Sequence, residues 1–528
     1  MNKLFLSFAS TLMLTLSISI QIKAQPVLDN TYSSDGYLLS NVSPSDADYA
    51  RSVLVQPNGR ILTGGNSIDG IGNADIRIIR TKTNGAMDNT FGASGIATIP
   101  GGFFCDMALL PNGKIIVAGS GVGPTNVNNF IVYRLTKNGM LDNTFGIGGS
   151  VEVNIANQHM ICFDVVIQAD GKIVLGGYLG GYGNNDMLIV RLKPNGNLDN
   201  SFATGGKFTF LQASKNSECK QLAIQPDGKI IAAGTIDTLL FFASLRYDFA
   251  AIRLTTTGTL DNTFGAGGVV RADKGTSDIA YAVSILSDGR IVLGGSTNYL
   301  GNSQFAALGL LSNGSIDNTF GTSGWTYFDF YGGGASCTAM VAEPDDDIIM
   351  AGLAYIFDGV SYQTIALAKL LSNGTPDITF GINGIDTSFN SIIGETCSDI
   401  ALQSDNKIVI SGYRATGTSA EFLTARYTNS AAFMKQAKEN IVIENNFNIY
   451  PNPNYGDFVI TTTSPIKENT RITISNLTGQ IFYTENISAQ EKPSNISIEL
   501  IHDLSEGIYF VNIKTNDQVI TKQFIVIR

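Results

Sequence analysis

Aspartate is the most regularly placed reactive residue in this sequence, because it recurs within a repeated phrase of the type Leu-Asp-Asn-Thr-Phe-Gly. The copies are Asp29, Asp88, Asp142, Asp199, Asp261, Asp317 and Asp377. Hard cations prefer carboxylate oxygens, so one hypothesis is a set of metal ligands. The alternative, which we favour, is structural: an aspartate in a turn accepts a hydrogen bond from its own backbone two residues on, and the following Phe fills the gap between units.

A second acidic feature is the triplet Asp345, Asp346 and Asp347. A calcium loop places its ligands at alternate positions around a central Gly, and the triplet has neither property. We interpret it as a solvated turn. Only His159 and His502 are present, and neither lies in a motif typical of a metal site or a Ser-His-Asp triad. The sequence therefore predicts no catalytic residue, no metal site and no cofactor.

The five cysteines are interpreted as occupying one position of the repeat. Four of them stand nine residues before the end of a turn motif, and Cys105 stands eight before it. The four are Cys162, Cys219, Cys337 and Cys397. Ala50 and Ala280 take this position in the other two units. Exchange with Ala indicates small packed side chains near the axis of a ring, so we predict reduced, buried thiols and no disulfide framework.

Aromatic residues gather in four variable segments, 178–186, 236–248, 299–304 and 355–363, together with Gly, Asn and Asp. Flat rings cover the apolar faces of sugars while polar groups bind the hydroxyls, so these segments are candidates for sugar recognition. The candidate ligand-binding residues are Tyr178, Tyr182, Phe241, Phe242, Tyr247, Tyr299, Tyr355 and Tyr362. The alternative is that these rings fill gaps between structural units.

Two alternating phrases divide residues 28–428 into seven units. The aspartate phrase recurs on average every 58 residues, and between its copies lies a turn such as Gln225-Pro226-Asp227-Gly228-Lys229. Each unit reads as four short antiparallel strands, which match one blade of a β-propeller. The chain starts with a closing phrase that its seventh unit lacks. We therefore predict an all-β fold, a seven-bladed β-propeller over residues 25–428 that is closed by its N-terminal strand.

The Asp-Gly-Lys-Ile turn, the Arg-Leu strand and the Leu-Asp-x-x-Phe-Gly-x-x-Gly close resemble the delta-60 repeat, a family of export-associated β-propeller repeats. The resemblance covers about residues 28–428, and it implies a fold rather than an activity. In the sixth and seventh units Asp346-Asp347 and Asn406-Lys407 replace Gly-Lys. These departures predict altered turns at both places.

Residues 1–24 have the pattern of a secretory signal peptide, with Lys3, an apolar stretch over 4–22 and Ala24 before the cut. The alternative is an uncleaved membrane anchor. No later segment has about 18 uninterrupted apolar residues, so we expect no transmembrane helix in the mature chain. The net charge is −11 and Lys and Arg form no basic run, which makes nucleic acid an improbable partner.

Residues 429–444 form a polar linker, and alternating strands over 445–528 predict a small antiparallel β-sandwich. The motifs of this segment include Tyr450, Pro451, Asn452, Pro453, Gly456, Gly479, Gly507 and Tyr509. They closely resemble the type A C-terminal sorting domain of the type IX secretion system of the Bacteroidetes. The resemblance implies the type IX secretion machinery as a partner, removal of the domain in the linker, and a chain that is secreted or attached to the exterior of the outer membrane.

Three functional hypotheses remain. The first is a non-enzymatic exported propeller that binds a glycan or a protein through loops on one face. The second is an extracellular polysaccharide-active enzyme, a glycosidase or lyase, which would show clustered carboxylates with raised pKa in a central pocket. The third is a purely structural or adhesive surface protein. The near-regular repeat favours binding or structure, because an active site breaks symmetry with converging polar residues.

Overall fold

The computed structural model describes most of residues 26–429 and parts of 447–526. In the first range the gaps are 44–45, 123–126, 156–157, 182–184, 212–215, 239–245, 275–276, 299–301, 331, 358–360, 388–393 and 416–418. In the second they are 451–456, 463–469, 477–480, 489–494, 500–503, 506 and 515–518. The chain divides into two compact units, residues 1–431 and 432–528. Within the described ranges, no helix has the length and apolar character needed to cross a bilayer.

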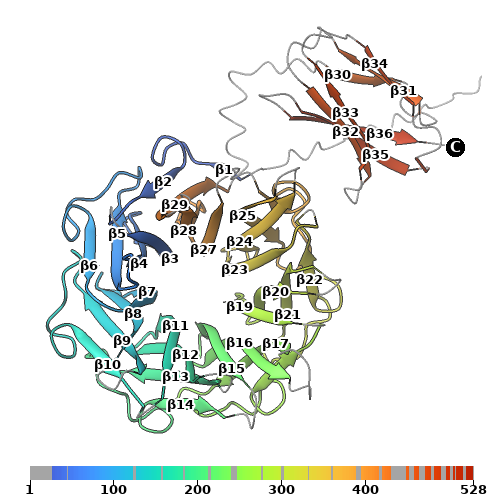
Figure 1. Ribbon diagram of the computed structural model, residues 1–528. Helices are drawn as coiled ribbons and strands as arrows, with labels where there is room; N and C mark the ends of the chain where they lie inside the picture. Colours follow the sequence, from blue (N-terminus) through green and yellow to red (C-terminus); the bar gives the residue numbers. More distant parts are fainter. Residues whose placement is uncertain are drawn as a thin grey trace, which may run out of the picture. The chain divides into compact units, whose positions relative to one another are not determined.

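Seven antiparallel sheets stand side by side in a ring in the first unit, as the predicted blades (Figure 1). In six of them each strand pairs with the next along the chain. Blade 1 consists of β3 (Ala47–Val55), β4 (Ile61–Ile68), β5 (Ala74–Thr81) and β6 (Ile96–Ile99). Blade 2 consists of β7 (Phe103–Leu109), β8 (Ile115–Val122), β9 (Asn128–Leu135) and β10 (Ser150–Val153). Blade 3 consists of β11 (Met160–Ile167), β12 (Ile173–Gly180), β13 (Asn185–Leu192) and β14 (Lys207–Phe210). Blade 4 consists of β15 (Ser217–Ile224), β16 (Ile230–Thr238), β17 (Arg246–Leu254) and β18 (Val269–Ala272). Blade 5 consists of β19 (Asp278–Ile285), β20 (Ile291–Thr297), β21 (Gln304–Leu310) and β22 (Trp325–Phe328). Blade 6 consists of β23 (Ala335–Ala342), β24 (Ile348–Phe357), β25 (Ser361–Leu370) and β26 (Ile385–Asp386).

The seventh blade combines both ends of the repeat region. It contains β27 (Glu395–Leu402), β28 (Ile408–Ala415), β29 (Ala420–Thr428) and the N-terminal strands β1 (Val27–Leu28) and β2 (Tyr37–Ser40), both paired with β29. The N-terminal segment thus completes the last blade, and β27 contacts β3 of blade 1. Strand pairing does not extend around the whole ring, however. Among the described strands no pairing joins one blade to the next, so the ring consists of separate sheets and is not a closed hydrogen-bonded barrel.

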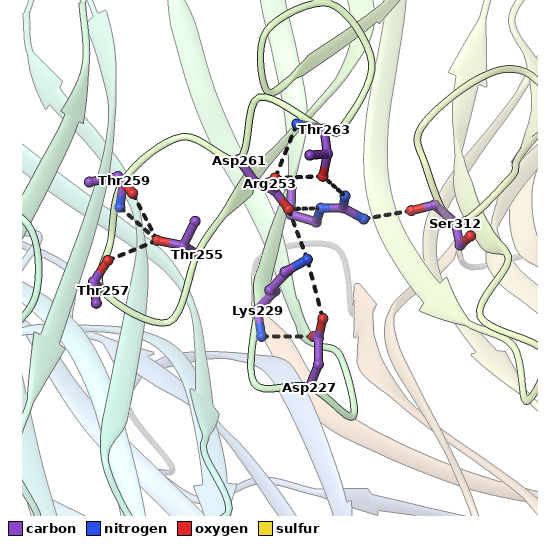
Figure 2. A network of polar contacts seen from close by, with 9 residues as sticks. All are labelled: Asp227, Lys229, Arg253, Thr255, Thr257, Thr259, Asp261, Thr263 and Ser312. Atoms are coloured by element: carbon purple, nitrogen blue, oxygen red, sulfur yellow. Dashed lines mark hydrogen bonds and ion pairs between the residues drawn. The ribbon is translucent and has the colours of Figure 1, made fainter.

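A buried Arg–Asp pair fastens one blade to the next. In blade 4, Arg253 Nε donates to Asp261 Oδ2 at 2.8 Å, and Arg253 Nη1 donates to the Ser312 carbonyl of blade 5 at 2.5 Å (Figure 2). The other Asp261 oxygen accepts the Thr263 N–H at 3.1 Å. The same Arg–Asp pairing occurs in Arg80–Asp88, Arg134–Asp142, Arg191–Asp199 and Arg426–Asp29. All seven repeated aspartates accept the N–H two residues on, which confirms the structural interpretation.

The Phe of the repeated phrase packs at the same junction between two blades. Phe264 is fully buried, and the Arg253 guanidinium lies 4.6 Å from its ring centroid, which is a cation–π geometry. Its ring also packs against the turn of the next blade, where a Cβ on Gly314 would come within 2.8 Å of it. The turn also requires φ of +82° at Gly314, which favours glycine for a second reason. Phe264 therefore fills the gap between blades, as expected.

The predicted change of turn in the sixth and seventh units is wrong. Asp346 and Asn406 have φ of 69° and 62°, which places them in the same left-handed region as Gly228 at 82°. The closing bond is also retained, because the Asp346 N–H donates to the Glu343 carbonyl at 3.0 Å. Asp and Asn tolerate this region better than other side chains do, so the turn survives the loss of Gly.

The second unit contains two antiparallel sheets over one core, as predicted. One sheet has the order β30 (Phe447–Tyr450), β31 (Asp457–Thr462), β34 (Asn495–Glu499), and the other β33 (Ile481–Ile487), β32 (Thr470–Asn476), β35 (Gly507–Lys514), β36 (Val519–Val526). Tyr509 is buried in this core and donates to the Ser505 carbonyl at 2.9 Å. Gly507 begins β35 and Tyr450 ends β30, whereas Pro451, Asn452, Pro453, Gly456 and Gly479 lie outside the described residues, as do residues 1–24.

The blade-to-blade fastening makes a prediction about stability. Arg253→Ala leaves the Asp261 carboxylate buried without its main partner, so we expect the free energy of unfolding to fall by about 3–5 kcal/mol. The matched control is Asp227→Ala in the same blade, because the Asp227 carboxylate is 55% exposed and its pair with Lys229 contributes about 1 kcal/mol or less. Urea denaturation followed by tryptophan fluorescence measures both. Equal losses in the two variants would contradict the role of the buried pair.

Candidate functional site

The innermost strand of every blade carries a β-bulge at the same place. The strand register skips one residue there, and these seven bulge residues are Arg51, Cys105, Phe163, Lys220, Tyr281, Thr338 and Ser398. None of the seven is buried. A bulge turns a side chain out of the regular alternation of a strand, so these positions can differ from blade to blade while the sheet is kept.

A glycine on the second strand makes room for the bulge. In blade 4 this is Gly234 on β16, which pairs with Cys219. A Cβ on Gly234 would collide with the carbonyl oxygen of Glu218. This glycine therefore has a steric role, because it leaves room for the backbone of Glu218 beside the bulge residue Lys220.

Blades 3, 4 and 5 bring an ion pair and four aromatic rings together at this level. Lys220 Nζ lies 2.6 Å from Glu218 Oε2, and Asn185 Nδ2 of blade 3 donates to Glu218 Oε1 at 2.8 Å. The Lys220 ammonium also lies 3.9 Å from the ring centroid of Phe163, whose ring is 5.8 Å from that of Tyr178. These contacts join the innermost strands β11 and β15 through side chains alone.

Two further tyrosines complete the group, which we call the Glu218 cluster: Phe163, Tyr178, Asn185, Glu218, Lys220, Tyr247 and Tyr281. Burial, and after it the negative charge of Glu218, raises the pKa of Tyr178, Tyr247 and Tyr281. The three phenols therefore all lie within electrostatic range of one carboxylate. All members are half-buried, so their rings keep some exposed surface.

The predicted ligand-binding residues divide into three groups. The structure brings Tyr178 and Tyr247 together in the Glu218 cluster. Tyr355 is 45% exposed on β24, and Tyr362 lies on β25 of the same blade 6, apart from the cluster. Tyr182, Phe241, Phe242 and Tyr299 lie outside the described residues. Sequence reasoning missed Phe163, Glu218, Lys220 and Tyr281, although variation at one position of an otherwise regular strand was the available signal.

Three more carboxyl groups, Asp106, Asp164 and Asp399, follow the bulges of blades 2, 3 and 7. Burial raises the pKa of all three, that of Asp399 to about 7, and the charge of Asp106 adds to the rise for Asp164 and Asp399. This clustering meets one criterion for an enzyme. Each carboxylate, however, accepts a backbone N–H of the next blade, as Asp164 does from Leu222 at 2.7 Å and Asp399 from Val53 at 2.8 Å. We interpret them as fasteners of the innermost strands.

The acidic triplet is only partly the solvated turn that the sequence predicted. Asp345 is exposed, but Asp346 accepts the Ser287 N–H of blade 5 at 2.7 Å. Asp345 and Asp347 lie with Glu343 in one acidic group. Lys369 Nζ lies 2.7 Å from Glu343 Oε2 and 3.5 Å from Asp347 Oδ2. An ammonium group therefore offsets part of the negative charge of this group.

The cysteines do not all share one repeat position, so that expectation needs correction. Cys162, Cys219, Cys337 and Cys397 precede the bulge, pair with glycine and are buried, as predicted. Cys105 is itself the bulge residue of blade 2, where Phe104 takes the paired position. The shorter spacing to the turn was the sign of this shift. All five are free thiols in the structure.

Two family models match the chain. Residues 448–527 match a secretion system C-terminal sorting domain. Residues 56–91, 110–145, 168–202, 225–264 and 286–320 match the β-propeller domain of unknown function DUF5122. The sorting domain and the propeller repeat are thereby confirmed, since the delta-60 repeat is a near match to this propeller family. A comparison with curated proteins finds no match.

Several solved structures are similar in fold. One is PorZ, a surface component of the type IX secretion system of Porphyromonas gingivalis, with 13% identity and a TM-score of 0.36; the match covers 89% of this chain and 58% of PorZ. Another is the polysaccharide lyase Uly1, with 11% identity and a TM-score of 0.42 over 72% of this chain and 89% of the lyase. A Trypanosoma rangeli sialidase has 10% identity and a TM-score of 0.40 over 93% and 91%. At such values the likeness says nothing about activity.

The buried carboxyl of Asp399 makes stability depend on pH. Its pKa is about 7 in the folded chain against an ordinary value of 3.8, so folding favours the protonated form. This contribution is fully present below pH 3.8 and is lost as the pH rises through about 7. Asp399→Asn cannot ionise, and we expect its Tm relative to the unsubstituted protein to rise between about pH 5 and pH 8.

Asp142→Asn is the control for this experiment. Although burial opposes it, contacts with Lys114, Thr144 and Arg134 hold the pKa of Asp142 below 3.8. Asp142 is therefore ionised in both the folded and the unfolded chain above about pH 5, and its variant should lose the same Tm at both pH values. Differential scanning calorimetry measures both variants. If the Tm of Asp399→Asn relative to the unsubstituted protein depends on pH as little as that of the control, the raised pKa of Asp399 is contradicted.

Proposed function

We propose that this chain, a DUF5122 β-propeller protein with a type IX sorting domain, is an exported binding module that recognises a glycan through the Glu218 cluster. The sorting domain implies export to the cell surface or the medium. Within the proposal, residues 1–24 are the signal peptide, 25–428 the binding propeller, 429–444 the linker that is cut, and 445–528 the sorting domain. The product is either released or attached to the surface.

One observation carries the proposal: the Lys220 ammonium of the Glu218–Lys220 ion pair lies over the Phe163 ring, and the Glu218 charge acts on three tyrosines. Two of the rings, Phe163 and Tyr281, occupy bulge positions where blades 6 and 7 carry Thr338 and Ser398. Aromatic faces match the C–H faces of sugar rings, and a carboxylate beside an ammonium matches their hydroxyls. The convergence of such groups from three blades breaks the symmetry of the propeller, as a binding site does.

Two acceptor atoms beside the cluster support the proposal. Asn185 Oδ1 and Asp237 Oδ1 are buried and have no hydrogen-bond partner within the described chain. Buried polar atoms are nearly always hydrogen-bonded, so each of these oxygens calls for a donor. A hydroxyl of a bound sugar is a donor of the right kind. Asp237 belongs to β16 and its charge adds to the raised pKa of Tyr247, so it lies beside the cluster.

The segment with Phe241 and Phe242 joins the strands that carry Asp237 and Tyr247. In the sequence it follows the end of β16 at Thr238 and precedes the start of β17 at Arg246. Both phenylalanines therefore remain candidate ligand-binding residues within this proposal.

Binding to a panel of polysaccharides and glycans, measured with the purified full-length protein by calorimetry, tests the proposal. Tyr281→Ala removes a ring and Glu218→Gln removes a charge while keeping the shape, so we expect each to weaken binding by about tenfold or more, which is roughly 1.4 kcal/mol. The control is Tyr355→Ala, whose ring is exposed on blade 6.

The outcomes of this assay are distinct. Equal losses in Tyr355→Ala and Tyr281→Ala would remove the Glu218 cluster from the proposal and leave blade 6 as the alternative. Absence of binding across the panel with folded protein would favour a protein ligand or a structural role. Breakdown of a polysaccharide that persists in Glu218→Gln but ends in Asp164→Asn would favour the enzyme, because the buried carboxyls would then act in catalysis.

A further inference from the structure

Two cysteines of neighbouring blades lie next to each other. Cys105 is the bulge residue of β7 in blade 2, and Cys162 precedes the bulge of β11 in blade 3. The neighbouring Cys105 thiol is, after burial, among the causes that raise the pKa of the Cys162 thiol. Strands β7 and β11 are adjacent innermost strands, so the contact crosses a junction between blades.

Ser120 fixes both cysteines from the second strand of blade 2. Its Oγ lies 3.7 Å from the Cys105 Sγ and accepts the backbone N–H of Cys162 at 3.0 Å. Both residues therefore converge on one hydroxyl. Cys105 is half-buried, whereas Cys162 is 1% exposed, so a reagent from solution reaches Cys105 first.

Each of the remaining cysteines contacts a backbone carbonyl of its own strand. The Sγ atoms of Cys219, Cys337 and Cys397 each lie 3.4–3.7 Å from the carbonyl oxygen two residues on. Cys162 makes the same contact with the Asp164 carbonyl at 3.7 Å. The position before the bulge is thus the same in all four blades. The shift of Cys105 onto the bulge is what adds a second thiol beside Cys162.

We propose that Cys105 and Cys162 form a disulfide that joins blade 2 to blade 3 after export. Exported chains meet oxidising conditions, under which disulfides form and persist. The oxidant is a small disulfide such as oxidised glutathione. Cys105 as thiolate attacks it and releases one reduced glutathione, and Cys162 then attacks the mixed disulfide and releases the second. Two protein thiols are oxidised, one glutathione disulfide is reduced, and the two thiol protons pass to the two glutathione sulfurs.

The test uses the full-length protein, purified under reducing conditions and then incubated, while folded, in excess oxidised glutathione. After denaturation, alkylation of free thiols and intact-mass analysis should show three of the five cysteines alkylated and a chain lighter by about 2 Da before alkylation. Peptide mapping should recover a cross-linked pair with Cys105 and Cys162.

Two variants make the test specific. Cys162→Ala restores the residue that Ala50 and Ala280 supply at the same place in blades 1 and 5, so it is expected to fold, and it should keep all four of its thiols. Cys219→Ser should still form the cross-link and keep two of four. Oxidation should also raise the Tm of the unsubstituted protein by several degrees and leave that of Cys162→Ala unchanged.

Several outcomes would overturn the proposal. These are five alkylated cysteines after incubation, a stable glutathione adduct on Cys105 without a cross-link, and a cross-link between other cysteines such as Cys337 and Cys397. A cross-link that lowers the Tm would show that the two backbones must move apart from their native positions to accept it.

Discussion

Six of the seven blades depend on an arginine whose hydrogen bonds leave its own sheet. Arg191 illustrates the constraint: its Nε donates to Asp199 at 2.9 Å in blade 3, and its Nη1 donates to the Thr256 carbonyl at 2.7 Å in blade 4. Both groups of the ion pair are buried, so the bonds form where water competes little and neither partner can be lost without a large penalty. Strand pairing holds each blade together, but this contact and the Phe beneath it hold one blade to the next.

The two blades that lack an arginine at this strand position show how strict the constraint is. In blade 5 the position is Gly309, the Phe320 ring takes the vacated space, and Arg290 reaches from the turn to the Ser372 carbonyl of blade 6 at 2.8 Å. In blade 6 the cation is Lys369, and its partners Glu343 and Asp347 stand where other units have Gln or Leu and Lys or Arg. A positively charged side chain therefore contacts the aspartate of the repeated phrase in every blade, but it is supplied in three different ways.

Features that depend on a few consecutive residues were predicted from the sequence, whereas features that depend on the register of paired strands were missed. Turns that need Gly, and an aspartate that bonds two residues on, are properties of a few consecutive residues, so the seven blades and the role of Asp261 were predictable. The Glu218 cluster was not, because Phe163, Lys220 and Tyr281 come from three blades and are turned by bulges that no local pattern announces. The bulge of blade 2 is likewise the reason why the position of Cys105 in the repeat was predicted incorrectly.

The bulge explains how one repeat serves both structure and recognition. The residue after it carries fasteners such as Asp164, whose carboxylate holds the Leu222 N–H of the next blade. The bulge residue itself is never buried, and at Phe163 and Lys220 its contact with the neighbouring blade is made by side chains alone. Substitutions there cost the ring little, since surface positions away from buried networks have small effects on stability. Recognition can therefore be built at one residue of a strand while its neighbour remains committed to the ring.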